Sequence, residues 1–96
     1  MRKSVLTPME EKCLVGIMSG LTVGETARRL NVGRQWASTL LSRANRKLGG
    51  GTDENGYFRT RALAIRAARL GVVSPEARLS ESGNITKSVR GAVRHQ

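Results

Sequence analysis

The chain has 96 residues, the length of one small domain. Lysine and arginine number 17 against seven acidic residues, and the resulting formal charge of +10 favours polyanionic partners. One cysteine, Cys13, and one histidine, His95, exclude a disulfide framework and an ordinary zinc site. No apolar run is long enough for a signal peptide or a membrane span, so we expect a cytoplasmic protein without membrane contact.

The positive charge is concentrated in the middle of the chain. Residues 1–27 carry three bases and three acids, whereas residues 28–70 carry ten bases and two acids, a net charge of +8. Residues 71–96 add a net charge of only +2. Solvated helix surfaces normally alternate the sign of their charges, so this block indicates a surface that binds a polyanion. The alternative is that the bases only keep the helices solvated.

Two helices with capping boxes are expected near the N-terminus. Thr7, Pro8 and Glu10 supply a threonine N-cap, a proline at the first helical position and a glutamate three residues after the cap. The segment Thr22-Val23-Gly24-Glu25 repeats the box and predicts a second, short helix. Asn31-Val32-Gly33 is expected to end it, because asparagine and glycine tolerate the left-handed conformation of a tight turn.

A third helix, expected over Arg34–Leu48, has one aliphatic and one polar face. At about 100° per residue, the aliphatic side chains gather on one side: Ala37, Leu40, Leu41, Ala44 and Leu48. The opposite side carries bases and short polar side chains and no acid: Arg34, Gln35, Ser38, Thr39, Ser42, Arg43 and Arg46. Short polar side chains can approach base edges in a DNA groove while arginines reach phosphates. Together with the two preceding helices, this pattern predicts a helix-turn-helix.

The remainder of the chain is expected to hold one more helix and an irregular tail. Residues 49–56 are read as a flexible glycine-rich connector, and a phosphate-binding loop is excluded because no Gly-Lys-Ser/Thr follows. A fourth helix is expected over Phe58–Leu70. The helix-turn-helix domain would then span residues 6–73, after a flexible arm at residues 1–5. Residues 74–96 show no sustained periodicity, which predicts a disordered basic tail that is dispensable for folding.

Several segments, in order and at matching spacing, resemble the LuxR-type helix-turn-helix domain. They read LTPME at 6–10, GLTVGETA at 20–27, LNV at 30–32, LSRANRKLG at 41–49 and AARLGVV at 67–73. The resemblance implies an all-α, four-helix DNA-binding domain that regulates transcription in bacteria or their phages and plasmids. Such domains usually follow a receiver or ligand-binding domain, and this one is expected to stand alone. Trp36, Ala37 and Leu40 depart from the family pattern, so the base preference of the family is not carried over.

The polar face and the resemblance together give the expected DNA contacts. Base contacts are expected from Arg34, Gln35, Ser38, Thr39 and Ser42. Contacts to the DNA backbone are expected from Thr22, Trp36, Arg43, Arg46 and Lys47, of which Lys47 is implied by the resemblance alone. The resemblance also gives Glu25 a structural role, bridging to a basic residue of the third helix. For Trp36, the alternative is a side chain that lies across the second helix.

The fourth helix is expected to pair two copies of the chain. Its apolar side chains cover roughly twice the arc of about 100° that one core needs. The residues expected at this dimer interface are Leu63, Ala64, Ala67 and Ala68. A two-fold pair would set two recognition helices about one DNA turn apart and would require an inverted-repeat site. The alternative is an alanine-rich segment that is merely a good helix former.

These features predict a nucleoid-associated regulator of transcription that binds double-stranded DNA as a homodimer. No metal, no cofactor and no enzymatic activity are expected, because the sequence has no paired-carboxylate, Ser/His or Cys/His arrangement. One alternative is an interaction protein, an anti-activator that heterodimerises with a full-length LuxR-type regulator. Another is a sigma-like factor that associates with RNA polymerase.

Overall fold

The computed structural model describes residues 6–54, 57–74 and 76–87. In these ranges the chain is mostly helical, with one small antiparallel sheet. The elements, in chain order, are α1 (Pro8–Met18), α2 (Val23–Leu30), α3 (Arg34–Lys47), α4 (Thr60–Leu70), β1 (Ala77–Leu79) and β2 (Ile85–Lys87). None of the helices in the described ranges has the length and apolar character needed to cross a membrane.

Both predicted capping boxes are confirmed. The hydroxyl of Thr7 accepts a hydrogen bond from the Glu10 backbone N–H, and the Glu10 carboxylate accepts one from the Thr7 N–H at 2.9 Å. Thr22 and Glu25 make the same reciprocal pair at the start of α2. Asn31 ends α2 in the expected left-handed conformation, with a φ of 60°. These boundaries depend on neighbours within four residues, which is why the sequence predicts them.

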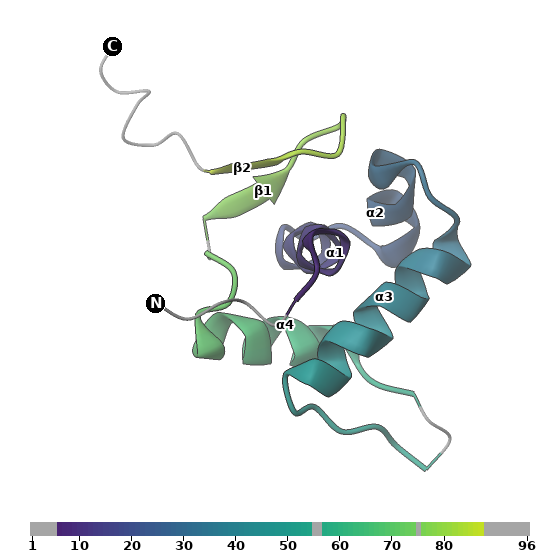
Figure 1. Cartoon of the computed structure of the whole chain (residues 1–96), viewed down its shortest axis with the longest axis vertical. Coiled ribbons are helices and arrows are strands. Elements are labelled where there is room, and N and C mark those ends of the chain that lie inside the picture. The colour runs from purple at the N-terminus through teal and green to yellow at the C-terminus, as the bar shows by residue number, and fades with distance from the viewer. Residues whose placement is uncertain (1–5, 55–56, 75, 88–96) are drawn as a thin grey trace.

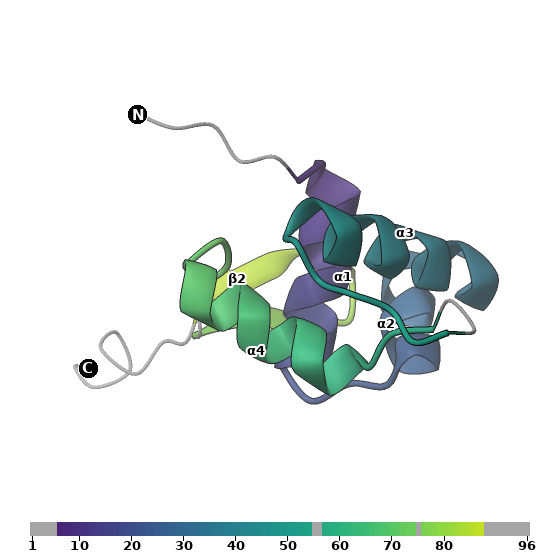
Figure 2. The same cartoon turned by 90° about the horizontal axis from the view of Figure 1, so that it is seen from below.

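The first helix, α1, lies at the centre of the domain. Figure 1 looks almost along its axis and shows α2 and α3 on one side, α4 on a second and the two strands on a third. Figure 2 shows that the C-terminal end of α3 lies beside the N-terminal end of α1. Gly16 allows the close crossing of α1 and α2, because a Cβ atom there would lie 2.5 Å from the Thr26 hydroxyl oxygen. The domain is therefore built around a helix buried on most of its surface.

The aliphatic face predicted for α3 is buried throughout: Ala37, Leu40, Leu41, Ala44 and Leu48. The fourth helix packs on α1 through Leu63 and Ala67, which are 1% and 0% exposed. These two residues therefore cannot form a surface for a second copy, and their expected place in a dimer interface is wrong. Ala64 is half-buried and Ala68 is exposed. The helix begins at Thr60, two residues later than expected.

A β-hairpin occupies part of the segment that was expected to be disordered. β1 pairs with β2 in antiparallel register, with Ala77 opposite Lys87 and Leu79 opposite Ile85. Ala77 and Leu79 are 4% and 2% exposed and join the main core, so the hairpin is part of the folded domain. The mostly helical fold is compatible with the expected all-α class, to which the small sheet is an addition, and the expectation of a disordered tail is wrong for residues 76–87. The rest of that tail, residues 88–96, and the expected arm at residues 1–5 lie outside the described residues.

Two contacts hold the hairpin against α2. The Arg29 guanidinium donates a hydrogen bond to the Leu79 carbonyl at 2.7 Å. Gly83, in the hairpin turn, has a φ of +86°, and a Cβ atom there would lie 2.6 Å from the Arg29 carbonyl oxygen. Because any larger residue would collide with backbone, the turn can approach α2 closely only with glycine at this position.

Candidate nucleic-acid interface

The polar face predicted for α3 is the exposed face of the helix. Burial of the aliphatic side sets the rotation of α3 about its axis, so the opposite side faces away from the core. Seven of the expected contact residues on α3 are exposed: Arg34, Gln35, Trp36, Ser38, Arg43, Arg46 and Lys47. Thr39 and Ser42 are half-buried. The helix contains no acidic residue, so its exposed face is uniformly basic or neutral.

The second helix is held beside α3 by a short turn. Residues 31–33 connect the two helices, and the Val32 N–H donates to the Ala27 carbonyl at 3.0 Å. α2 and α3 pack against each other, and both also contact α1. Thr22 is exposed at the start of α2, where its hydroxyl caps the helix. This arrangement presents α3 on a rigid base formed by two other helices.

Trp36 and Arg43 form a stacked pair on α3. Trp36 is 45% exposed, and the Arg43 guanidinium carbon lies 5.3 Å from the centroid of its ring. Such cation–π contacts contribute about 0.5–1 kcal/mol at exposed sites. Trp36 is absent from the apolar side chains that pack on the core, so its ring pairs with its own helix and does not serve as a core residue. The stack restricts Arg43 to one edge of the exposed face.

Lys47 makes a contact that the sequence did not indicate. Its Nζ atom lies 2.8 Å from Oε1 of Glu10, whose side chain is almost fully buried. Desolvation is the largest single effect and raises the pKa of Glu10. The hydrogen bonds from Lys47 and Thr7 and the charge of Lys47 lower the pKa, and together they outweigh desolvation, so the pKa lies below its ordinary value. Glu10 is thus ionised at neutral pH. Lys47 therefore has a structural role in an ion pair, and the DNA-backbone contact expected for its exposed ammonium stays a prediction.

Glu25 is also placed differently from the expectation. Its carboxylate accepts a hydrogen bond from the Thr22 N–H at 2.9 Å and so completes the capping box of its own helix. The backbone hydrogen bond from Thr22 is the main cause of a lowered pKa; desolvation opposes it, and the Thr22 hydroxyl and the charges of Arg28 and Arg29 support it. All these partners belong to α2 or its cap, so the expected bridge to the third helix is replaced by a contact within the second.

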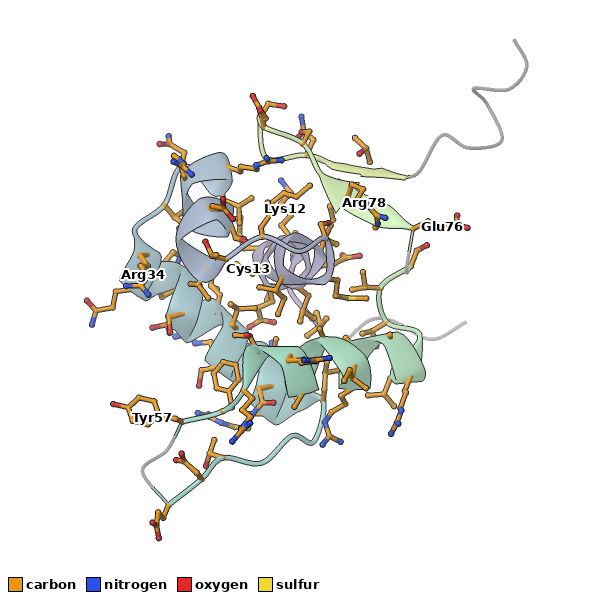
Figure 3. The ribbon with its side chains drawn as sticks, turned by 180° about the vertical axis from the view of Figure 1, so that it is seen from behind. Lys12, Cys13, Arg34, Tyr57, Glu76 and Arg78 are labelled. Atoms are coloured by element: carbon orange, nitrogen blue, oxygen red, sulfur yellow. The ribbon has the colours of Figure 1, made fainter. Side chains whose placement is uncertain are left out.

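The connector between α3 and α4 returns along the exposed face of α3. A cleft of about 350 Å³ lies between them, with Ser38 and Ser42 on one wall and Tyr57 on the other. The backbone N–H of Tyr57 donates to the Asp53 carboxylate at 2.9 Å, and the Asp53 N–H donates to the Tyr57 carbonyl at 2.8 Å. Figure 3 shows Tyr57 and Arg34 projecting from the same side of the molecule. The sequence did not single out Tyr57, because its position depends on the path of a connector without periodicity.

The candidate interface therefore consists of the exposed face of α3, bordered by the Trp36–Arg43 pair and by the connector. Its chemistry is that of arginines interspersed with hydroxyl and amide groups. Comparisons of the chain with protein-family models, with curated proteins and with solved structures found no match.

Proposed function

We propose that this protein binds double-stranded DNA in a sequence-specific manner through α3 and thereby regulates transcription. The observation that carries the proposal is the exposed face of α3, which has three arginines, several short polar side chains and no acid. That face belongs to a helix whose orientation is set by α1 and α2. The LuxR-type resemblance of the sequence supports the same reading.

The dimensions and chemistry of α3 suit the major groove of DNA. An α-helix with its side chains is about 10–12 Å across, and the major groove of B-DNA is about 12 Å wide. Gln35 and Ser38 lie in the N-terminal half of α3, and their uncharged polar side chains can hydrogen-bond to base edges when the helix lies close to them. Arg43 and Arg46 lie further along, where longer side chains can reach phosphates.

A homodimer formed through α4 is part of the proposal. Ile65 and Leu70 are 47% and 55% exposed, so α4 leaves aliphatic surface uncovered in the monomer. With Leu63 and Ala67 buried in the monomer, the surface left for a second copy centres on Ala64, Ile65 and Ala68. A two-fold pair through this surface would present two copies of α3 to an inverted repeat.

The decisive experiment measures binding of the full chain to duplex DNA by fluorescence anisotropy, after selection of preferred duplexes from a random-sequence pool. If each protomer neutralises roughly three to five phosphates, a dimer should lose on the order of a thousandfold in affinity between about 50 and 200 mM salt. Selection of a common sequence is expected in addition to this salt dependence. A chain that binds no duplex even at low salt, or enriches no sequence, would contradict the proposal.

A further inference from the structure

Among the large apolar and aromatic side chains of the described residues, Tyr57 is the most exposed, and it borders α3. Its side chain is 72% exposed, and its backbone N–H and carbonyl each make a hydrogen bond to Asp53. The next residue, Phe58, packs partly against the core and anchors the end of the connector. The backbone of Tyr57 is therefore held at the rim of the candidate interface, and its ring lies largely in solvent, where the protein interior gains little from it.

The cleft beside Tyr57 is lined by uncharged hydroxyl and amide groups together with the apolar side chains of Val23, Leu41 and Phe58. Hydroxyl groups line it from α3, from the connector and from the start of α4: Ser38, Ser42, Tyr57 and Thr60. The Thr39 hydroxyl also lines it but donates to the Gln35 carbonyl of its own helix at 3.1 Å. Gln35 adds an amide, and the lining contains no carboxylate. Neutral donors of this kind commonly bind the phosphate and sugar groups of DNA. The cleft is partly open to solvent.

The cleft and the Trp36–Arg43 pair lie on opposite edges of α3. At about 100° per residue, Ser38 and Ser42 fall on one side of the exposed face, and Trp36 and Arg43 fall on the other. A helix that occupies the major groove has one DNA strand along each of its edges. The two edges of α3 therefore meet different strands.

We propose that the cleft between α3 and Tyr57 binds the sugar–phosphate backbone of the DNA strand opposite the one that Arg43 contacts. This inference rests on the proposed function. The Tyr57 ring packs on a deoxyribose and its hydroxyl donates to a phosphate oxygen, while Ser42 faces the same strand. Tyr57 and Arg43 thus contact the two strands that border the groove, and together they set the depth at which α3 enters it.

The test compares three variants of the full chain on the duplex that the wild-type protein selects from a random-sequence pool. Tyr57→Ala is expected to weaken binding about tenfold and Tyr57→Phe about threefold, since a ring contact and one hydrogen bond are lost in the first and only the hydrogen bond in the second. Arg43→Ala serves as the reference for the other edge. Because Tyr57 is largely exposed, the thermal midpoint of both Tyr57 variants should match the wild type.

Single neutral methylphosphonate linkages, placed along each strand in turn, then assign the contacts. Neutral linkages on one strand should abolish the effect of Tyr57→Phe, and those on the other strand should abolish the effect of Arg43→Ala. If the Tyr57 variants bind as tightly as the wild type, or if both effects map to the same strand, the inference is overturned while DNA binding stands. If the wild-type chain binds no duplex, the proposed function fails and the inference fails with it.

Discussion

The Nζ atom of Lys47 lies 2.8 Å from Oε1 of Glu10, and this ion pair ties the last turn of α3 to the first turn of α1. The same carboxylate oxygen accepts the backbone N–H of Thr7 and so also closes the cap of α1. Glu10 is 1% exposed, whereas the Lys47 side chain is 36% exposed. One buried oxygen therefore joins the start of the central helix to the end of the helix proposed to read DNA.

Loss of the Lys47 ammonium should destabilise the domain, because the Glu10 carboxylate would stay buried without a cation. Lys47→Met is expected to lower the free energy of unfolding by about 1–3 kcal/mol, and less when Glu10→Gln is already present. A double-mutant cycle by urea denaturation measures this coupling. Additive effects of the two substitutions would show that the ion pair contributes nothing.

The same pair makes the stability of the domain depend on acid pH. The pKa of Glu10 in the folded state lies below its ordinary value of 4.5, so its contribution is fully present above that pH. It is lost as the pH falls through the folded-state value. Glu10→Gln should therefore flatten the decline in unfolding free energy below about pH 4.5. A decline as steep as that of the wild type would assign the acid sensitivity to other carboxylates.

Substitutions at phosphate contacts and at base contacts on α3 should have different effects: the first should change the salt dependence of binding, and the second the sequence preference. Arg43→Ala and Arg46→Ala are each expected to weaken binding to every duplex and to reduce the salt slope by about one for each bound protomer. Ser38→Ala should instead change sequence preference, with a loss of about 1–3 kcal/mol on the selected site. Anisotropy titrations at several salt concentrations on selected and scrambled duplexes measure both effects.

Lys12→Ala is the matched control for the arginine substitutions. Lys12 lies on α1 under the hairpin, away from α3 (Figure 3), so the variant removes one positive charge outside the candidate interface. It should leave the salt slope unchanged. An equal reduction in slope for Lys12→Ala and Arg46→Ala would show that net charge alone governs binding.

Association through α4 should fail when negative charge is placed on its exposed side. Ala68→Glu would bring two carboxylates together across a two-fold axis, so sedimentation should show a monomer and affinity for the full inverted repeat should fall. Thr86→Glu adds the same charge on the exposed hairpin, outside α4, and should still pair. A wild-type chain that sediments as a monomer both free and on DNA would rule out this interface.

The hairpin should be required for full stability. Leu79 is 2% exposed and packs in the main core, so Leu79→Ala is expected to lower the unfolding free energy by about 2–4 kcal/mol. Glu81 is exposed in the hairpin turn, and Glu81→Ala should change that energy by less than about 0.5 kcal/mol. Thermal or urea denaturation compares the two variants. If Leu79→Ala is as stable as Glu81→Ala, the hairpin does not contribute to the core.

Two helical glycines should respond in opposite directions to alanine. At Gly16 a Cβ atom would collide with the Thr26 side chain, so Gly16→Ala should destabilise by about 1–3 kcal/mol. At Gly24 the nearest atoms lie 3.9 Å away, so Gly24→Ala should stabilise by about 0.5–1 kcal/mol through helix propensity. Thr26→Ala should partly rescue the Gly16 variant. Equal effects at the two glycines would argue against a close crossing of α1 and α2.

Features set by near neighbours in the chain were predictable from the sequence. Both capping boxes and the Asn31 helix end depend on residues within one turn, and the two faces of α3 follow from helical periodicity. The aliphatic side of α3 is buried as expected, so the exposed residues of the candidate site were correctly placed on one face. The DNA contacts assigned to that face stay predictions.

The remaining features depend on contacts between distant parts of the chain. An apolar arc on α4 does not tell which sector faces α1, and packing decided that Leu63 and Ala67 are inside while Ala68 is outside. Three-residue strands are too short for a period of two to stand out, so only pairing and burial against α1 reveal the hairpin. Glu10 and Lys47 are 37 positions apart, and folding alone brings their charges together. The sequence by itself determined the local helices and the polar face of α3, whereas tertiary packing decided which other residues border that face, because burial and ion pairing act through space.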